Sequence, residues 1–201
     1  MVLKAIDKQL ISIRKFKAYS YSQALKQLFL FPYDYFLRNG KSTMPLNIAL
    51  FLTLRCNAKC SMCNLKDILN KDNREFSLEQ IENFLKQIAR YKPSIILFGG
   101  EPLLRRDFVE ILKMMKKYKL SCGIFTNGTL LNFLNTKEIV ANEMNFVAFS
   151  VQGIGKTHDK IVGLNNAFDK MIKAIKEFQK YKNKKTKIII HTTISEDNLN
   201  E

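Results

Sequence analysis

The sequence predicts an α/β fold built on a parallel sheet, and three observations lead to this prediction. Five short runs are almost continuously apolar and rich in Ile, Val and Phe, as expected of strands that are covered on both faces. Amphipathic segments with helical spacing lie between these runs. Three of the runs begin 26 residues apart, at residues 94, 120 and 146, which is typical of repeated βαβ units.

The predicted strands follow one another with a helix-sized interval between them. They cover residues 46–54, 94–98, 120–126, 146–151 and 187–194. Ligands of parallel α/β sheets and barrels bind at the carboxyl ends of the strands. The residues that follow each run are therefore the first candidates for a functional site.

Polar residues mark the expected starts of three helices. Ser77 opens the first helix, and Gln80 completes a capping box three residues later. Asp107 begins the second helix, and Asn166 is expected to cap the third. Apolar residues follow each start at intervals of three or four, so each helix has one apolar face that can pack on the sheet.

The chain is expected to have two parts. Residues 1–45 predict an N-terminal helical extension, with one or two amphipathic helices before a break at residues 31–45. Residues 46–201 form the domain that carries the sheet. The N-terminal helices could pack on this domain or lie on a membrane surface, because they combine Lys with Phe and Leu.

The C-terminal segment "SEDNLNE" predicts the start of a helix after the fifth strand, with Ser195 as its N-cap. The sequence stops within that turn, so we expect a domain that is incomplete at its C-terminus. The fifth strand would then present an open edge that a partner chain could complete. We expect weak or no activity from such a chain by itself.

The composition excludes several classes of protein. The longest apolar runs are too short to cross a bilayer, and charges interrupt the first 17 residues too often for a signal peptide. The net charge of +15 suggests a nucleic-acid partner, but Lys dominates Arg and no aromatic RNA-binding motif is visible. A nucleic-acid partner is therefore the weaker expectation, and a membrane surface or an acidic substrate remains open.

The segment "CNAKCSMC" spaces three thiols as C-x3-C-x2-C, at Cys56, Cys60 and Cys63. Three thiolates can bind three irons of a 4Fe–4S cube and leave the fourth iron open to a small molecule. The alternative is a zinc site, which needs a fourth ligand from His158, His191 or Cys122, beside a basic surface that binds nucleic acid. Closely spaced thiols of either kind fit a reducing compartment, so we expect a cytoplasmic protein.

The order of the motifs resembles that of one enzyme family. C-x3-C-x2-C is followed by GGEP at residues 99–102 and TNG at residues 126–128, each after a predicted strand. Over about residues 47–198 the chain is similar to the radical S-adenosylmethionine (radical SAM) superfamily. The resemblance implies a partial TIM-type barrel of six βα units, of which five strands are present here. A catalytically inactive fragment of such a protein is a further interpretation.

The resemblance also implies the cofactors. The three cysteines would hold a 4Fe–4S cluster whose open iron binds the amino and carboxylate groups of S-adenosylmethionine (SAM). One-electron reduction by a donor such as a flavodoxin or ferredoxin would produce a 5′-deoxyadenosyl radical that takes a hydrogen atom from substrate. The substrate, a small molecule or a peptide, is not indicated, and no residue is nominated as a catalytic acid or base.

Positions that match the motifs of the superfamily indicate which residues after the first three strands would bind the cofactor. Met62 corresponds to a position that touches the adenine, although it could also fill the core. Gly99 and Gly100 would let the backbone approach the cofactor, and Glu101 would accept a hydrogen bond from the methionyl ammonium. The alternative is a simple turn. Asn127 would contact cofactor or substrate, although Asn-Gly is also a common turn dipeptide.

The run "SVQGIGKTHDKIVG", residues 150–163, resembles superfamily members that carry SPASM-type auxiliary-cluster domains, which often modify peptides. Ser150 matches that pattern and would reach the ribose or carboxylate of SAM. Gln152 replaces the usual Asp and could still bind ribose hydroxyls. His158 and Asp159 are expected in the following loop, as part of an Asp-capped turn rather than as catalytic groups.

Side chains alternate between the two faces of the fifth strand, so one of two pairs of residues must face the interior of the barrel. His191 with Thr193 is favoured for the cofactor side over Ile190 with Thr192. Cys122 lies in the middle of an apolar run and is expected in the core.

Overall fold

The computed structural model describes residues 28–42, 45–71 and 74–201. The chain divides into two compact units, Met1–Leu46 and Asn47–Glu201, and each is described by itself.

The described part of the first unit is helical from residue 28 and continues as a π-helix, η1, over Tyr33–Leu37. The helix ends at Asn39 and Gly40, whose φ angles of 51° and 75° are left-handed. The predicted break at residues 31–45 is therefore wrong in its start, because the chain stays helical through Leu37. The helices expected within residues 1–27 lie outside the described residues.

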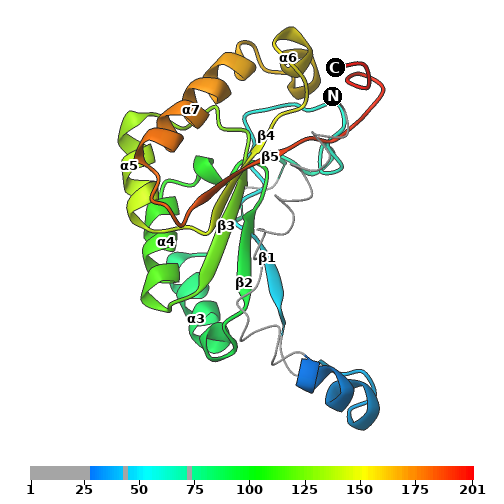
Figure 1. Ribbon diagram of the computed structural model, residues 1–201, viewed down its shortest axis with the longest axis vertical. Helices are drawn as coiled ribbons and strands as arrows, with labels where there is room; N and C mark the ends of the chain where they lie inside the picture. The colour runs from blue at the N-terminus through cyan, green and yellow to red at the C-terminus, as the bar shows by residue number, and fades with distance from the viewer. Residues whose placement is uncertain (1–27, 43–44, 72–73) are drawn as a thin grey trace. The chain divides into compact units, whose positions relative to one another are not determined.

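The second unit contains one sheet of five parallel strands (Figure 1). The strands are β1 (Asn47–Phe51), β2 (Ser94–Phe98), β3 (Ser121–Thr126), β4 (Phe146–Ser150) and β5 (Lys187–His191). Their order in the sheet is the same as their order in the chain. The predicted parallel sheet is confirmed, with strand ends that differ from the prediction by a few residues.

The helices of this unit are α3 (Leu78–Ile88), η2 (Ala89–Tyr91), η3 (Pro102–Leu104), α4 (Phe108–Lys117), α5 (Phe133–Ala141), α6 (Lys156–Val162) and α7 (Ala167–Tyr181). Of these, α3, α4, α5 and α7 lie on one face of the sheet, whereas α6 lies beyond the ends of the strands (Figure 1). A doubly wound fold reverses its strand order and covers both faces with helices. An unreversed order with helices outside is the arrangement of a barrel segment, in which the other face lines the interior.

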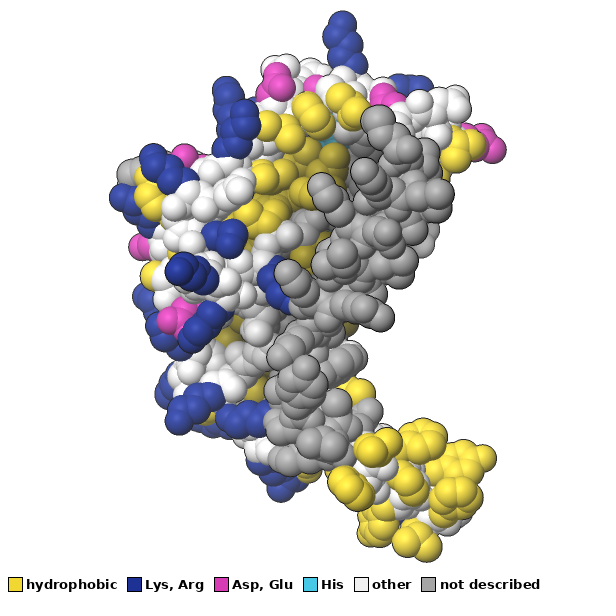
Figure 2. Space-filling view, in the orientation of Figure 1, with side chains coloured by type: hydrophobic (Ala, Val, Ile, Leu, Met, Phe, Trp, Pro, Cys, Tyr) yellow, Lys and Arg dark blue, Asp and Glu magenta, His cyan; other side chains and the backbone are white. Residues whose placement is uncertain are grey.

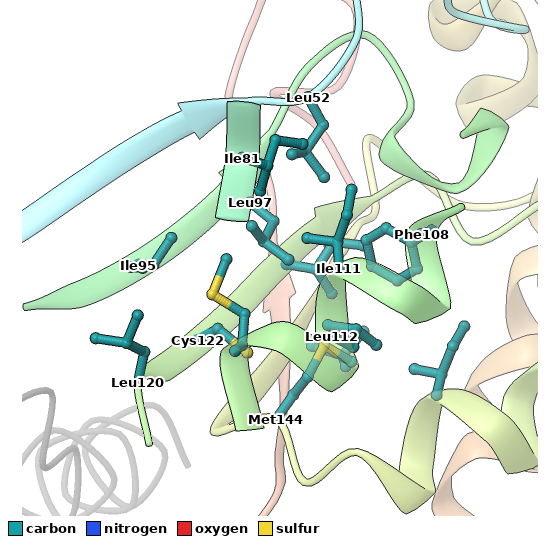
Figure 3. Close-up of a cluster of buried hydrophobic side chains, with 14 of the residues drawn as sticks. Leu52, Ile81, Ile95, Leu97, Phe108, Ile111, Leu112, Leu120, Cys122 and Met144 are labelled. Atoms are coloured by element: carbon teal, nitrogen blue, oxygen red, sulfur yellow. The ribbon is translucent and has the colours of Figure 1, made fainter. Parts of the chain in front are cut away.

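The hydrophobic core fills the space between the sheet and these helices (Figure 3). Ile95 and Leu97 of β2 point into it and meet Ile111 and Leu112 of α4, and all four are fully buried. Cys122 of β3 is also buried there, as predicted, and burial raises the pKa of its thiol to about 12. This thiol therefore belongs to the packing on the helix side of the sheet.

Side-chain caps formed at some of the expected helix starts. Ser77 makes the predicted capping box at α3. Asn166 has a left-handed φ of 56° and makes no side-chain cap at α7. Asp159 replaces it, because its carboxylate accepts hydrogen bonds from two backbone N–H groups at the start of α7, both at 2.8 Å. Asp159 and His158 lie in helix α6 rather than in the predicted loop.

The segment after β5 forms turns over residues 196–200 instead of the predicted helical turn. The Ser195 side chain does not act as an N-cap there; its backbone N–H donates to Oδ1 of Asn198 at 2.7 Å. The buried Asn198 side chain donates in turn to the carbonyls of Gln152 and Thr193, at 3.0 and 2.8 Å. These bonds fasten the segment to the loop that follows β4.

Candidate functional site

A cavity of about 730 Å³ opens at the carboxyl ends of the strands. Its walls come from the cysteine loop after β1, the Gly-Gly-Glu turn after β2 and the segments that follow β3, β4 and β5. Every residue nominated above as a ligand of the 4Fe–4S cluster or of SAM lines it: Cys56, Cys60, Met62, Cys63, Gly99, Gly100, Glu101, Asn127, Ser150, Gln152, His191 and Thr193. The other candidates for a zinc ligand, His158 and Cys122, do not line it. The topology therefore brings together residues that are far apart in the sequence.

The three thiols on the cysteine loop are half-buried and free. Burial raises the pKa of Cys56, and burial together with the neighbouring thiols raises the pKa of Cys60 to about 11. Binding a metal would therefore release protons from these groups. Among the described residues, no three His, Cys, Asp or Glu side chains gather closely enough to hold one metal ion. Three thiols spread around a cavity fit a cluster of several irons better than a closed zinc site.

The backbone of the first cysteine is held by Asn70. The N–H of Cys56 donates to Oδ1 of Asn70 at 2.9 Å, and the Asn70 amide donates to the Cys56 carbonyl at 3.1 Å. Asn70 has a φ of 61°, and its own N–H donates to the carbonyl of Leu54 at 3.0 Å. Asn70 was not nominated from the sequence, because nothing in its local pattern signals a contact with Cys56.

The middle of the cysteine loop pairs with the end of helix α6. The N–H groups of Lys59 and Ser61 donate to the carbonyls of Val162 and Ile161, both at 2.9 Å. A Cβ at Gly163 would lie 2.8 Å from the Lys59 carbonyl oxygen, so only glycine permits this approach. The loop after β4 therefore supports the cysteine loop as well as lining the cavity.

Two arginines join the cysteine loop to the turn after β2. Arg55 pairs with Glu75 at 2.9 Å and donates to the carbonyl of Leu104 at 3.3 Å. The buried Arg105 pairs with Asp107 at 2.6 Å and donates to the carbonyl at the end of β1, Leu52, at 3.1 Å. These groups lie outside the cavity lining and stabilise the position of the loop.

Gly99 and Gly100 line the cavity, and they also have a packing role that the sequence did not predict. The N–H of Gly100 donates to the carbonyl of Thr53, and the N–H of Glu101 donates to the carbonyl of Arg55, both at 2.9 Å. A Cβ on either glycine would overlap a backbone oxygen of this segment. The glycines therefore allow the turn to pack directly on the chain that leads into the cysteine loop.

Glu101 is fully buried at the cavity wall. Its Oε1 accepts from the Thr126 hydroxyl at 2.8 Å and from the N–H of Leu103 at 3.2 Å, and its Oε2 accepts from the N–H of Asn127 at 2.8 Å. Burial raises the pKa of this carboxyl to about 7, although these hydrogen bonds lower it. Oε2 keeps one lone pair that a cationic ligand could use.

The Asn127 side chain is engaged by protein groups. Its amide donates to Oδ1 of Asn57 at 2.9 Å, and its Oδ1 accepts from the Thr129 hydroxyl at 2.6 Å. The Asn57 amide closes the ring by donating to the Thr129 hydroxyl at 2.9 Å. This ring ties the cysteine loop to the loop after β3, so Asn127 has little free hydrogen-bonding capacity for a ligand.

Gln152 also makes structural bonds. Its Oε1 accepts from the N–H of Thr193 at 2.9 Å, which links the ends of β4 and β5. Its own N–H donates to Nδ1 of the buried His158 at 3.0 Å, and burial lowers the pKa of that imidazole. The residue predicted to bind ribose hydroxyls therefore lines the cavity and also holds two strand ends together.

His191 and Thr193 line the cavity, whereas Ile190 is exposed on the opposite face of β5. Ser150 is the register partner of His191 on the neighbouring strand β4. The His191 ring meets Phe125 edge-on, with 5.3 Å between the ring centroids. Of the two alternating pairs, the favoured one faces the cavity.

A comparison with known protein families matches residues 50–201 to the radical SAM superfamily. The chain belongs to this superfamily. Its cofactors are a 4Fe–4S cluster and SAM, and Cys56, Cys60 and Cys63 supply the cysteine pattern of the family. The predicted family, partial barrel and cofactors are confirmed. The zinc-binding module is therefore the weaker interpretation of the three cysteines.

Two curated relatives show how far the similarity extends. The chain is 29% identical over 171 residues to Fe-coproporphyrin III synthase of Methanosarcina barkeri, covering 84% of this chain and 41% of that protein. It is 30% identical over 135 residues to a probable GTP 3′,8-cyclase of Pyrococcus horikoshii, covering 67% and 43% respectively. The chain thus spans less than half the length of these relatives.

The fold is shared with SuiB of Streptococcus suis, solved with bound SAM. The TM-score is 0.67 at 21% identity, and the match covers 98% of this chain and 46% of SuiB. No described helix is long and apolar enough to cross a membrane. Figure 2 shows Lys and Arg side chains scattered over the visible face of the sheet unit rather than gathered in one patch.

Proposed function

We propose that this chain is the core of a radical SAM enzyme that removes a hydrogen atom from its substrate. When bound, the cluster and SAM supply a one-electron cleavage of the sulfonium that generates a carbon radical. Cys56, Cys60 and Cys63 would hold three irons. The protein's remaining work is to bind, orient and shield these groups.

The observation that carries the proposal is the convergence of three thiols and one buried carboxylate on a single cavity. The described chain has one further cysteine, Cys122, and it is buried outside the cavity lining. A four-iron cube held by three cysteines would keep one iron without a thiolate, and that iron would be available to SAM. Glu101, across the cavity wall, would accept a hydrogen bond from the methionyl ammonium through its free Oε2 lone pair.

Replacing Glu101 with Gln should weaken SAM binding by about 1.5–3 kcal/mol, roughly 10- to 150-fold in Kd, because a charge-assisted hydrogen bond is lost. The variant keeps an oxygen acceptor for Thr126 and Leu103, so iron loading should be retained. The pKa of about 7 adds a second expectation. Wild-type affinity should fall as the pH drops below about 7, because protonated Glu101 cannot pair with an ammonium.

Titration of SAM into the iron-loaded protein, followed by electron paramagnetic resonance, measures both effects. Glu110→Gln is the matched control, because it removes a carboxylate from an exposed ion pair with Lys113. If Glu101→Gln binds SAM with unchanged affinity, Glu101 does not bind the methionyl ammonium.

The relatives do not agree on a substrate, since one name concerns a porphyrin and the other GTP. The electron would come from a small reduced protein such as a flavodoxin or ferredoxin. We place the protein in the cytoplasm, because its thiols must stay reduced to bind iron.

A further inference from the structure

Aromatic rings form a ladder on the face of the sheet opposite the helices. Phe51 of β1 and Phe98 of β2 are register partners, and their rings stack with centroids 5.9 Å apart and planes 20° apart. Phe98 and Phe125 of β3 stack more closely, with centroids 4.9 Å apart and planes 9° apart. His191 continues the row beyond Phe125.

This ladder is not part of the hydrophobic core. Phe98 and Phe125 are only half-buried and line the cavity, and Phe51 is 48% exposed on the edge strand. By contrast, Phe149, on the helix side of β4, is fully buried. A row of apolar rings that runs from the cofactor cavity toward a sheet edge provides a surface on which a large apolar ligand can lie.

The stacking determines what kind of ligand fits. Phe98 covers a face of Phe125 and Phe51 covers a face of Phe98, so the ladder presents ring edges rather than faces to the open side. Ring edges carry the positive end of the aromatic quadrupole and prefer the face of another π-system. A flat conjugated molecule laid across the ladder would receive edge-to-face contacts from two or three rings at once.

The charges around the cavity restrict the choice further. Lys59 and Lys66 line the cavity and are exposed. The side-chain ammonium of each has no ion-pair partner among the described residues. Glu101 is the carboxylate of the lining, and its oxygens already accept hydrogen bonds from the protein. No arginine is among the described residues of the lining, so the positive charge there comes from lysine ammonium groups. These charges suit an anionic ligand, such as one that bears carboxylates.

We propose, on the basis of the proposed function, that the substrate is a planar conjugated molecule that bears carboxylates, as a tetrapyrrole does. It lies across Phe98 and Phe125, and its carboxylates reach Lys59 and Lys66 at the rim. The ladder thus favours a flat ring system over an extended peptide, and a titration with GTP tests whether a smaller flat ring with phosphates binds better.

The test titrates coproporphyrin III, a planar tetracarboxylate, into the iron-loaded full chain and follows its fluorescence. Phe98→Leu and Phe125→Leu should each weaken binding about 3- to 10-fold, and the double variant more than tenfold, because edge-to-face contacts are lost. Lys59→Gln with Lys66→Gln should weaken binding further and reduce its salt dependence. Phe76→Leu is the control, because Phe76 is exposed and lies outside the cavity lining.

Three results would overturn the proposal. These are equal affinity in all phenylalanine variants, tighter binding of GTP than of coproporphyrin III, and loss of SAM affinity in the Phe98 and Phe125 variants. The last result would assign the ladder to the cofactor. SAM binding measured on the same samples separates this inference from the proposed function, which survives if SAM binds and the porphyrin does not.

Discussion

Replacing any one of Cys56, Cys60 or Cys63 with Ala should abolish stable iron loading. All three thiols line one cavity, and the remaining cysteine, Cys122, lies outside it. Two thiolates from a single loop do not hold a four-iron cube. Iron and sulfide analysis after anaerobic reconstitution measures the effect, and the variants should lose the brown colour of the cluster.

Cys122→Ala is the matched control for these three variants. Cys122 is buried on the helix side of β3, outside the cavity lining, so its loss should cost about 1 kcal/mol of packing and no iron. Equal loss of iron in all four variants would contradict the assignment of three specific ligands.

Gly100→Ala should damage both the stability of the fold and the assembly of the cluster. Its Cβ would overlap the carbonyl of Arg55 and the Cβ of Cys56, neither of which is the end of a flexible side chain. We expect a loss of about 3 kcal/mol in the free energy of unfolding and impaired cluster assembly, because the cysteine loop must move. Urea denaturation of the iron-free protein and iron analysis of the reconstituted protein measure the two effects.

Gly155→Ala separates steric overlap from backbone strain. Gly155 has a φ of 55°, but a Cβ there would meet no atom within 4 Å. Its substitution should cost about 1–3 kcal/mol, because φ 55° with ψ −119° is a backbone conformation that residues with a Cβ rarely adopt, and it should leave iron loading intact. If Gly100→Ala loads as much iron as Gly155→Ala, the close packing of the Gly-Gly-Glu turn is not required.

The sheet could be predicted from the sequence because its strands are short, apolar and evenly spaced. Helix α3 could be predicted because Ser77 and Gln80 form a local capping box. Helix α5 could not, because residues 133–141 lack a clear apolar stripe and its start is capped by reciprocal hydrogen bonds between Asn132 and Asn135, which is not the usual Ser/Thr and Glu/Gln pattern of a capping box. The cap of α7 was assigned to Asn166, whereas Asp159, on the preceding helix, supplies it. Local patterns do not show such contacts between elements.

The cluster and SAM ligands nominated from the sequence all line the cavity, because each lies at or shortly after the end of a strand. What could not be predicted is how these residues divide between ligand contact and support. Asn127 and Gln152 were nominated as ligands, yet their side chains bond to Thr129 and Thr193. Asn70 supports Cys56 from a position that only the folded loop brings close. Hydrogen-bond saturation is a property of the fold, so motif matching alone does not show it.

The central claim is that three cysteines hold a cluster whose open iron faces SAM. Electron paramagnetic resonance of the reduced, reconstituted protein, recorded with and without SAM, tests it most directly. We predict an iron–sulfur signal that changes when SAM is added, because SAM binds the iron that has no cysteine ligand. A colourless protein that retains zinc instead of iron, or a cluster signal that SAM leaves unchanged, would contradict the claim.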